Sequence, residues 1–544
     1  MDGIKWANPL MEFKNNLGVH SKKCSLLGRV RSFFSSVSLF FWPIGEGESA
    51  KVRLMLGMAF CIYFNYNLLR SIKDVLLVNM SDAGAETLSF VKTLILIASF
   101  IFVSWFMNVS SRWSWHALFF RITCGFGLFF FLFASVLYPF QDHLHAPWLE
   151  VKAMEVLPVG MRGMVVLFSN WTYTLFYIAS EMWGVLMLQL LFWGFANEIS
   201  SLEESKRFYS LFSFSGQTSG FISGPISALS SSFFLHFNPF PFAEPWSQSL
   251  IAMMTIVCWV CVIILFLFHK IESLFGSTQS LQLQNENSHQ NSEHEKKKEG
   301  NFLKRFIRDI KFVMQSPHLV YVLILILAYN ATINISEILW KHELKKACAS
   351  NKSVYHSVMG IVTLCTSAYA SLAALFGAGP SIRHWGWRFA ALVTPVLFCC
   401  TFLPFISIKL WPVLGISLGG SWCLTLLGAF NNCFARGSKY TFFDNTKDMA
   451  LIPLASGDKR KGKAAIDGLG SRLGKALGSW ILMPGVIFAQ SLDRLVPLLG
   501  VLISVICFLW ILSILRLNER LKSIGMKSRG LRETTEEEMS IASS

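Results

Sequence analysis

Charged and amide side chains occur within apolar segments of this sequence, where they are costly unless they have a function or a partner. Asn67, Arg70 and Lys73 follow one another at intervals of three residues, and Asp74 stands beside Lys73. On a helix this spacing places the first three side chains on one face, and such a face suits the binding of phosphate oxygens. The alternative is a structural ion pair between Lys73 and Asp74 near the aqueous end of the helix.

Two carboxylates lie deeper in apolar runs. A charge at the centre of a transmembrane helix costs about 2.5–3.5 kcal/mol on insertion scales, so each one is a candidate functional group. Glu181 stands near the middle of the run 163–198, and Glu337 precedes Lys341 by four residues. Lys341 could therefore simply neutralise Glu337 on the same helix. Either carboxylate could instead carry a proton. Desolvation raises the pKa of a carboxyl group and a nearby cation lowers it, so the sequence leaves this alternative open.

Further cations follow in the second half of the chain. Arg436 and Lys439 lie three residues apart at the end of an apolar run, and Lys463 and Lys475 belong to a Gly-rich segment, 461–475. Small residues allow helices to approach closely in a bilayer, which could bring these cations to a central path. A basic loop outside the membrane is the alternative for the start of this segment, but it explains Lys475 poorly.

Motifs for enzymatic or metal chemistry are not convincing. Residues 457–463 read G-x-x-x-x-G-K, but Ala464 occupies the position where a P-loop has Ser or Thr, and the segment lacks the strand that should precede it. Cys258 and Cys261 form a C-x-x-C pair within an apolar run, without the second pair that a zinc site needs. We therefore expect no ATPase or other enzyme activity, no bound metal and no cofactor.

The elements that carry these groups are expected to be membrane helices. The chain has 544 residues, of which 53% are hydrophobic and 15% charged, and its mean hydropathy is +0.48. Apolar runs of roughly 20 residues, the length that crosses a bilayer, can be placed about twelve times. The runs are 53–79, 87–108, 116–138, 163–198, 208–231, 249–269, 318–341, 355–379, 386–408, 411–443, 464–490 and 494–516.

Basic residues follow the expected membrane topology, which explains the net charge of +15 without a nucleic-acid partner. Lys and Arg cluster before the first run and in alternate loops, whereas 79–86 and 232–248 contain neither. This is the positive-inside pattern, so both termini are expected in the cytosol and the chain in a cell membrane, such as a bacterial inner membrane. No cleavable signal peptide is expected before the first run.

The chain is expected to consist of two related halves. A polar segment, 279–300, divides it near the middle, and the sequence RWSW at 112–115 is similar to HWGW at 384–387. Six helices per half is an even number, so the halves share one orientation, as in major-facilitator transporters. The expected fold is an all-α polytopic protein with an N-terminal segment, a first half, a polar linker, a second half and a C-terminal tail. These segments are 1–52, 53–270, 271–317, 318–516 and 517–544.

Several motifs in this order resemble the ADP,ATP carrier (nucleotide transporter) family of obligate intracellular bacteria and plastids. The resemblance extends along most of the chain, and it includes an eight-residue match at 191–198. The motifs are FWPI at 41–44, FNYNLLRSIKD at 64–74, EMWG at 181–184, LFWGFANE at 191–198, EILWK at 337–341, GKAAID at 462–467 and LGK at 473–475.

The resemblance implies a major-facilitator-like fold, nucleotide substrates (ATP, ADP and other nucleoside triphosphates), and central Lys and Glu residues. These residues correspond to Lys73, Glu181, Glu337 and a Lys of the segment 463–475. Two departures concern the transport mode. Ser71 and Ile72 replace the family's Asp and Thr, and Gly216-Gln217-Thr218 replaces its G-A-N. They favour proton-coupled import of nucleoside triphosphates over ATP/ADP exchange.

The residues and the resemblance together predict a nucleotide transporter that works by alternating access in contact with membrane lipids. The substrate-binding residues would be Asn67, Arg70, Lys73, Glu181, Glu337, Lys341, Arg436, Lys439, Lys463 and Lys475. Glu181 and Glu337 would also couple movement to protons or to a counter-substrate. The alternatives are a membrane-embedded enzyme that acts on nucleotide-linked lipid precursors and a receptor or scaffold that transports nothing.

Overall fold

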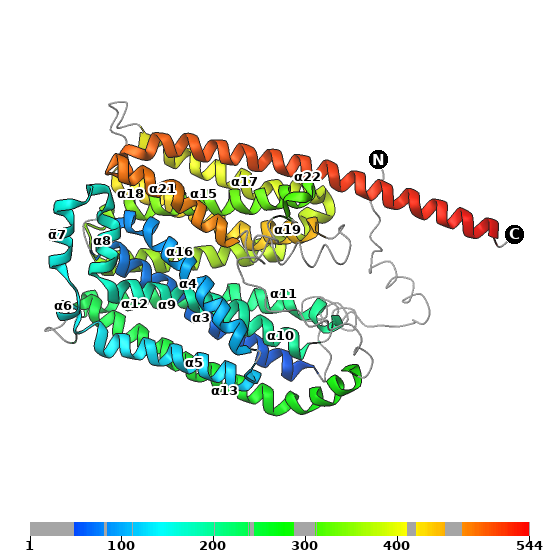
Figure 1. The fold of residues 1–544 in the computed structure, drawn as a ribbon, viewed down its shortest axis with the longest axis horizontal. Helices are drawn as coiled ribbons and strands as arrows, with labels where there is room; N and C mark the ends of the chain where they lie inside the picture. The colour runs from blue at the N-terminus through cyan, green and yellow to red at the C-terminus, as the bar shows by residue number, and fades with distance from the viewer. Residues whose placement is uncertain are drawn as a thin grey trace, which may run out of the picture.

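The computed structural model describes residues 48–80, 84–110, 112–200, 202–237, 239, 244–287, 311, 313–410, 420–451 and 471–542, and these residues contain no β-strand. Long helices run side by side in one bundle (Figure 1). In the first half they are α3 (Ser49–Val78), α4 (Thr87–Ser110), α5 (Trp115–Leu132), α9 (Trp171–Trp183), α10 (Trp193–Ile199), α11 (Leu202–Thr218), α12 (Gly220–His236) and α13 (Pro245–Asn287). In the second half they are α15 (Pro317–Ala347), α16 (Lys352–Leu372), α17 (Gly379–Leu410), α18 (Ser421–Ser438), α19 (Asp444–Ala450), α21 (Ser471–Ala489) and α22 (Leu492–Ala542).

Shorter elements connect or extend these helices. The helices α6 (Gln141–Leu144), α7 (Pro147–Val156) and α8 (Arg162–Ser169) lie together at one end of the bundle, which we call the α7 end; the opposite end is the α10 end (Figure 1). Short 3-10 turns form η1 (Gly84–Glu86) and η3 (Val159–Met161). Wider π turns form η2 (Phe133–Leu137), η4 (Gly184–Phe192), η5 (Ala373–Ala378) and η7 (Lys439–Phe443).

Nine helical segments of the described chain are long and apolar enough to cross a membrane. Three expected spans are helical but do not meet that measure. The run 208–231 is interrupted at Ser219 between α11 and α12, while 411–443 and 464–490 begin in residues outside the described part. The start of the run 163–198 was predicted wrongly. Asn170, with a φ of −107° and a ψ of 51°, ends α8, and a new helix begins at Trp171.

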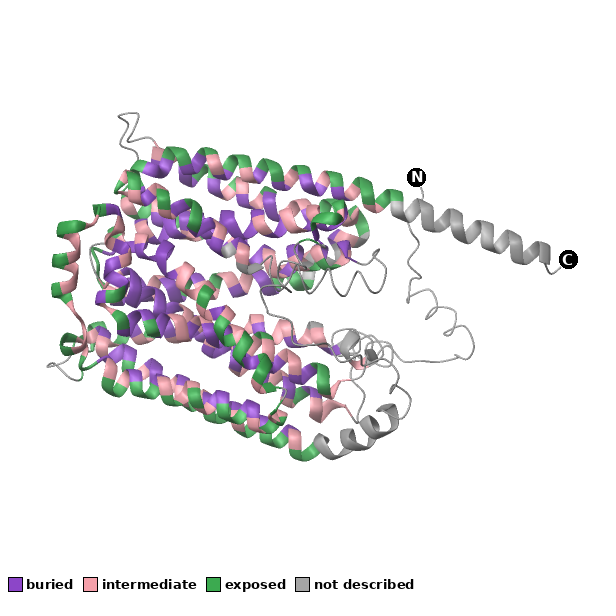
Figure 2. Cartoon of the chain, in the orientation of Figure 1, coloured by how far each residue is buried: buried purple, intermediate pink, exposed green. Residues whose placement is uncertain are grey.

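The outer surface of the bundle is apolar, which suits lipid contact. Large hydrophobic side chains such as Phe131 on α5, Phe266 on α13 and Phe508 on α22 are about 60% exposed or more. Figure 2 shows exposed residues along these outer helices and buried residues between the inner ones. Exposed apolar surface of this extent is characteristic of a protein whose solvent is the bilayer.

Contacts between the two halves have a two-fold pattern. The most extensive contact between helices in the described structure is that of α12 with α16, and α4 packs along α21. The repeat that places runs one to six on runs seven to twelve exchanges these two pairs, because it relates α4 to α16 and α12 to α21. A helix also begins within the repeated W-x-W motif of each half, at Trp115 and after the kink at Gly386, whose φ is +80°.

Glycine allows the close approach of α12 and α16. A Cβ built on Gly224 would lie 2.7 Å from the carbonyl oxygen of Gly360, and one built on Gly360 would lie 2.6 Å from that of Gly224. The two backbones therefore touch without side chains between them, as small residues permit in membrane helices. The central residues of α3 and α15 are held at the distance that this contact sets.

We expect Gly224→Leu to separate α12 from α16 and to destabilise the protein by about 1–3 kcal/mol, the usual effect of overpacking. The measurement is the thermal unfolding midpoint of the purified chain in detergent. The matched control is Gly125→Leu on α5, where an added Cβ meets nothing within 4 Å. Equal midpoints for the two variants would show that the α12–α16 approach is not tight.

Candidate functional site

Helix α3 presents two groups of polar residues to the middle of the bundle. Tyr63, Asn67 and Arg70 recur at intervals of three or four residues and face a central pocket, while Lys73 and Asp74, one turn nearer the α7 end, are 4% and 1% exposed. Most other residues of this helix are apolar, and its 3.6-residue period determines which side chains share the inward face.

Lys73 and Asp74 begin a row of ion pairs through the core. The ammonium Nζ of Lys73 lies 2.6 Å from Oε1 of Glu181 on α9 and 3.6 Å from Oδ1 of Asp74. Tyr177, one turn before Glu181, donates its hydroxyl to Asp74 at 3.2 Å, and its ring lies 3.7 Å from Lys73 Nζ. A cation between two carboxylates and an aromatic face is well compensated in an apolar interior.

The row continues into the second half through Lys341. Its Nζ lies 2.6 Å from Oδ2 of Asp74 and also 2.6 Å from Oε1 of Glu337, and Oε2 of Glu337 lies 2.6 Å from a terminal nitrogen of Arg436 on α18. The pair of Asp74 and Lys341 joins one half to the other. We call these six residues (Glu181, Lys73, Asp74, Lys341, Glu337 and Arg436) the charge row.

Charges alternate along the row, with three cations and three anions. A buried charge is tolerated when each of its neighbours has the opposite sign, and here Lys73 and Lys341 each contact two carboxylates. Lys92 on α4 adds another polar link between the halves by donating to the side-chain oxygen of Asn334 on α15. The halves are thus joined by charges nearer the α7 end than the pocket.

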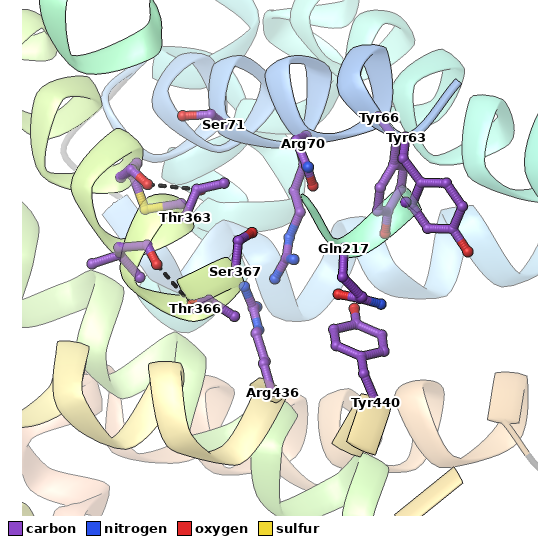
Figure 3. A pocket seen from close by; sticks show the side chains of 14 residues that line it. Tyr63, Tyr66, Arg70, Ser71, Gln217, Thr363, Thr366, Ser367, Arg436 and Tyr440 are labelled. Carbon is purple, nitrogen blue, oxygen red and sulfur yellow. Dashed lines mark hydrogen bonds between the residues drawn. The ribbon is translucent and has the colours of Figure 1, made fainter. Parts of the chain in front are cut away.

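Beside the charge row lies a pocket between the two halves. Arg70 and Arg436, one from each half, extend into it toward one another, and Gln217 of α11 lies next to them (Figure 3). The pocket is lined by Tyr63, Tyr66, Asn67, Arg70, Ser71, Gly216, Gln217, Met359, Val362, Thr363, Thr366, Ser367, Arg436 and Tyr440.

Two of the lining side chains have no polar partner among the described residues. Neither the guanidinium of Arg70 nor the amide of Gln217 makes a hydrogen bond or an ion pair there, whereas Asn67 donates to Oγ of Ser219 at 3.0 Å. Arg70 offers five N–H donors in a planar fork that matches phosphate or carboxylate oxygens. The pocket can therefore bind an anion, with Arg436 held in place by Glu337.

Most of the predicted site residues meet in this region. Asn67, Arg70 and Arg436 line the pocket, and Lys73, Glu181, Glu337 and Lys341 belong to the charge row together with Arg436. For Glu337 the alternative of an ion pair with Lys341 is real, but the pair is one link of a longer row. Lys73 also pairs with Asp74, at a longer distance than with Glu181.

Three predicted cations lie elsewhere or outside the described part. Lys439 begins η7, where its Nζ is 3.7 Å from Asp444 and 4.9 Å from the ring of Tyr440, and it does not line the pocket. Lys475 lies on α21, and its side chain is outside the described part of the structure. Lys463 is outside it altogether.

Sequence reasoning missed other groups at the site. Asp74 was considered only as a partner of Lys73, and its contact with Lys341, 267 residues away, could not be read from the chain. The tyrosines and threonines gave no signal because they are ordinary residues of apolar helices, and Gln217 was considered only as a departure from the family's G-A-N that bears on the transport mode. The i, i+3 spacing of Tyr63 and Tyr66 with Asn67 and Arg70 on one helical face was the available indication.

One cluster outside the pocket has the composition of a metal site. Donor atoms of His342, Glu343 and Asp493 lie within 4.8 Å of one another. The ammonium group of Lys409 contacts both carboxylates, and that of Lys346 lies 2.6 Å from Asp493. These ammonium groups supply the positive charge that a metal ion would bring, so we interpret the cluster as a structural ion-pair network.

Comparison with known proteins finds relatives along most of the chain. The "ADP,ATP carrier protein 1" of Chlamydia pneumoniae is 34% identical over 496 residues, which cover 89% of this chain and 94% of that protein. The chloroplastic "ADP,ATP carrier protein 1" of Arabidopsis thaliana is 32% identical over 92% of this chain and 78% of its own length. The "ADP,ATP carrier protein 3" of Rickettsia prowazekii is 31% identical, with 90% and 97% covered.

Solved structures share the fold at low sequence identity. A bacterial homologue of the iron transporter ferroportin, in an inward-facing state, has a TM-score of 0.54 at 12% identity, with 85% of this chain and 97% of that chain covered. A D-xylose–proton symporter has a TM-score of 0.50 at 11% identity, with 86% and 97% covered. These likenesses support the expected all-α, major-facilitator-like architecture of a multi-pass membrane protein.

The family assignment rests on the sequence itself. The sequence profile of the TLC ATP/ADP transporter family matches residues 28–521, nearly the whole chain. The members of this family are carriers, so the alternative of a membrane-embedded enzyme has no support. With its helical bundle, its central pocket and its charge row, this chain belongs to the TLC ATP/ADP transporter family.

Proposed function

We propose that this protein transports adenine nucleotides, ATP and ADP, across a cell membrane by alternating access. The observation that carries the proposal is the pair Arg70 and Arg436, which face one another across the central pocket from opposite halves. Relatives about a third identical over most of the chain are named ADP,ATP carriers. A polyphosphate is the anion that fits two converging guanidinium groups.

Binding would draw the two halves together around the phosphates. Arg70 makes no ion pair among the described residues, so a phosphate group can occupy its fork without displacing a carboxylate. Arg436 is held by Glu337, and a phosphate that approached it would compete with that carboxylate. Substrate binding would thus weaken the pair of Arg436 and Glu337 and, through Lys341, affect the pair of Lys341 and Asp74.

The cross-half pair of Asp74 and Lys341 would act as the lock at the α7 end. It must break before the halves can separate there. A substrate that draws Arg436 away from Glu337 leaves that carboxylate to Lys341, which already lies 2.6 Å from it, and this stronger pair lowers the cost of breaking the lock. In this scheme Glu181 and Glu337 couple binding to movement, and Lys463, Lys475 and Lys439 remain candidates for contacts made in other conformations.

Topology and coupling follow from the same proposal. Positively charged loops would place both termini and the linker 271–317 in the cytosol and the α7 end outside. The two halves of the transporter would be residues 53–270 and 318–516. Proton-coupled import of other nucleoside triphosphates is the second candidate. It is favoured by Ser71, which lines the pocket where relatives of this family have an aspartate, and by Glu181 and Glu337 as proton acceptors.

We expect Arg70→Gln to raise the KM for ATP about 10- to 100-fold, since a charge-assisted hydrogen bond contributes about 1.5–3 kcal/mol. The measurement is uptake of labelled ATP by cells that express the full chain. Arg53→Gln is the matched control, because Arg53 lies on the same helix, is exposed and contacts only the carbonyl of Ser49. Unchanged KM values in the Arg70 variant would remove this residue from the site.

The transport mode can be separated in the same cells. Uptake of labelled ATP is measured with and without internal ADP, and with and without a protonophore. Exchange predicts that internal ADP accelerates uptake and that the protonophore has little effect. Collapse of uptake with the protonophore, without stimulation by ADP, would instead establish proton coupling, and no uptake of ATP, GTP or UTP would reject the proposed function.

We expect the lock to appear as coupling in a double-mutant cycle. Asp74→Asn and Lys341→Gln should each lower the stability of the detergent-purified chain, and the double variant should lose about 1–3 kcal/mol less than the sum. Thermal or denaturant unfolding provides the measurement. The pair Lys51 and Glu204, partly buried and within one half, serves as the control and should couple by less than about 1 kcal/mol. Additive losses at Asp74 and Lys341 would argue against the lock.

A further inference from the structure

The central pocket has two chemically different ends. Tyr63 and Tyr66 of α3 and Tyr440 of η7 lie on one side of the two arginines, with Gln217 between them, whereas Thr363 and Thr366 of α16 lie on the other (Figure 3). One end therefore offers aromatic rings and an amide, and the other offers hydroxyl groups. The arginines stand between the two.

Two of the aromatic rings are held in place by glycines. A Cβ on Gly216 of α11 would lie 2.5 Å from the ring of Tyr63, and one on Gly184 of η4 would lie 2.8 Å from the ring of Tyr66. Only glycine leaves room for the rings against these helices. Both rings are only partly buried and line the pocket, so each has a fixed position and can still contact a ligand.

The amide of Gln217 presents a donor and an acceptor side by side at the aromatic end of the pocket. It lines the pocket, and the described residues provide no hydrogen-bond partner for it. A half-buried amide without a partner is disfavoured unless a ligand or water satisfies it. An amide can pair with two adjacent atoms on the edge of a planar ring if one accepts and the other donates.

We propose that this end of the pocket is a nucleobase subsite that selects adenine, with Gln217 as the residue that reads the base. The amide nitrogen would donate to N7 of adenine, and the amide oxygen would accept from the N6 amino group, the pairing that glutamine makes with adenine elsewhere. Guanine presents acceptors at both N7 and O6, so the amide oxygen would face O6 without a hydrogen bond. The tyrosine rings provide the stacking surface.

This subsite rests on the proposed function, because it assumes that the phosphates bind Arg70 and Arg436. The nucleotide would then lie with its base among the tyrosines and its terminal phosphates toward Thr363, Thr366 and Ser367. The hydroxyls of Thr363 and Thr366 donate to backbone carbonyls of their own helix in this structure, so they would have to rotate to donate to phosphate oxygens. An analogue that leaves polar groups of the pocket without hydrogen bonds binds much more weakly. A pocket with such groups therefore discriminates between substrates better than an apolar pocket does.

The test measures uptake of labelled ATP and GTP by proteoliposomes that contain the purified full chain, with unlabelled inorganic tripolyphosphate as a competitor that lacks a base. The wild-type chain should have a KM for GTP about five- to a hundredfold above that for ATP. Gln217→Ala should bring this ratio close to one, with inhibition by tripolyphosphate unchanged. Gln217→Leu keeps most of the side-chain volume and should give the same ratio if the protein is folded.

Tyr440→Leu should raise the KM for ATP and GTP together, about five- to a hundredfold, again without a change in tripolyphosphate inhibition, because stacking does not distinguish the bases. Thr218→Ala is the matched control for Gln217. Thr218 is the next residue of α11, its hydroxyl donates to the carbonyl of Ser215 at 2.8 Å, and it does not line the pocket. Its ratio should equal that of the wild type.

Each outcome has one meaning. A Gln217→Ala chain that keeps the wild-type ratio, or a wild-type ratio near one, would overturn the assignment of Gln217 while nucleotide transport itself stands. Loss of tripolyphosphate inhibition in Gln217→Ala would overturn the separation of base and phosphate ends. Wild-type proteoliposomes that take up neither nucleotide would instead reject the proposed function, and the subsite with it.

Discussion

The burial of charge in an apolar bundle is the constraint on which the rest of this structure depends. Lys73, Asp74 and Lys341 are each less than 5% exposed, and an isolated charge in such surroundings would cost several kcal/mol. Alternation of cations and anions along the charge row removes most of that cost. Helices α3, α9, α15 and α18 must therefore be arranged so that their charged side chains meet, and the small residues between α12 and α16 allow that arrangement.

The same constraint connects the pocket to movement. Arg436 belongs both to the pocket and to the charge row, and Asp74 and Lys341 join the halves one turn nearer the α7 end. An anion in the pocket competes directly with a carboxylate of the row, so occupancy and the contact between halves share one set of charges. A ligand shifts a conformational equilibrium only through such differential interactions. In this chain they are short electrostatic contacts rather than a distant pathway.

Different side chains of the pocket suit different parts of a nucleotide. Arginines from both halves suit phosphates, which all nucleotides share, while aromatic rings and one amide suit the base, which differs among them. Affinity and selectivity can then be set by different side chains. Gly216 and Gly184 leave room for the rings of Tyr63 and Tyr66, respectively.

The sequence alone was sufficient to predict the helical membrane fold, the family and several of the charges that lie inside the bundle. Hydropathy and residue spacing are local properties, so they identified Arg70, Lys73, Glu181, Glu337 and Arg436 and the inward faces of their helices. Which charges meet depends on the tertiary structure: Asp74 pairs with Lys341, 267 residues away, while Lys439 pairs with nearby Asp444. The tertiary structure also brought Gln217 and three tyrosines to one end of a pocket, because the neighbour of a helical face depends on how helices pack, which a single sequence does not encode locally.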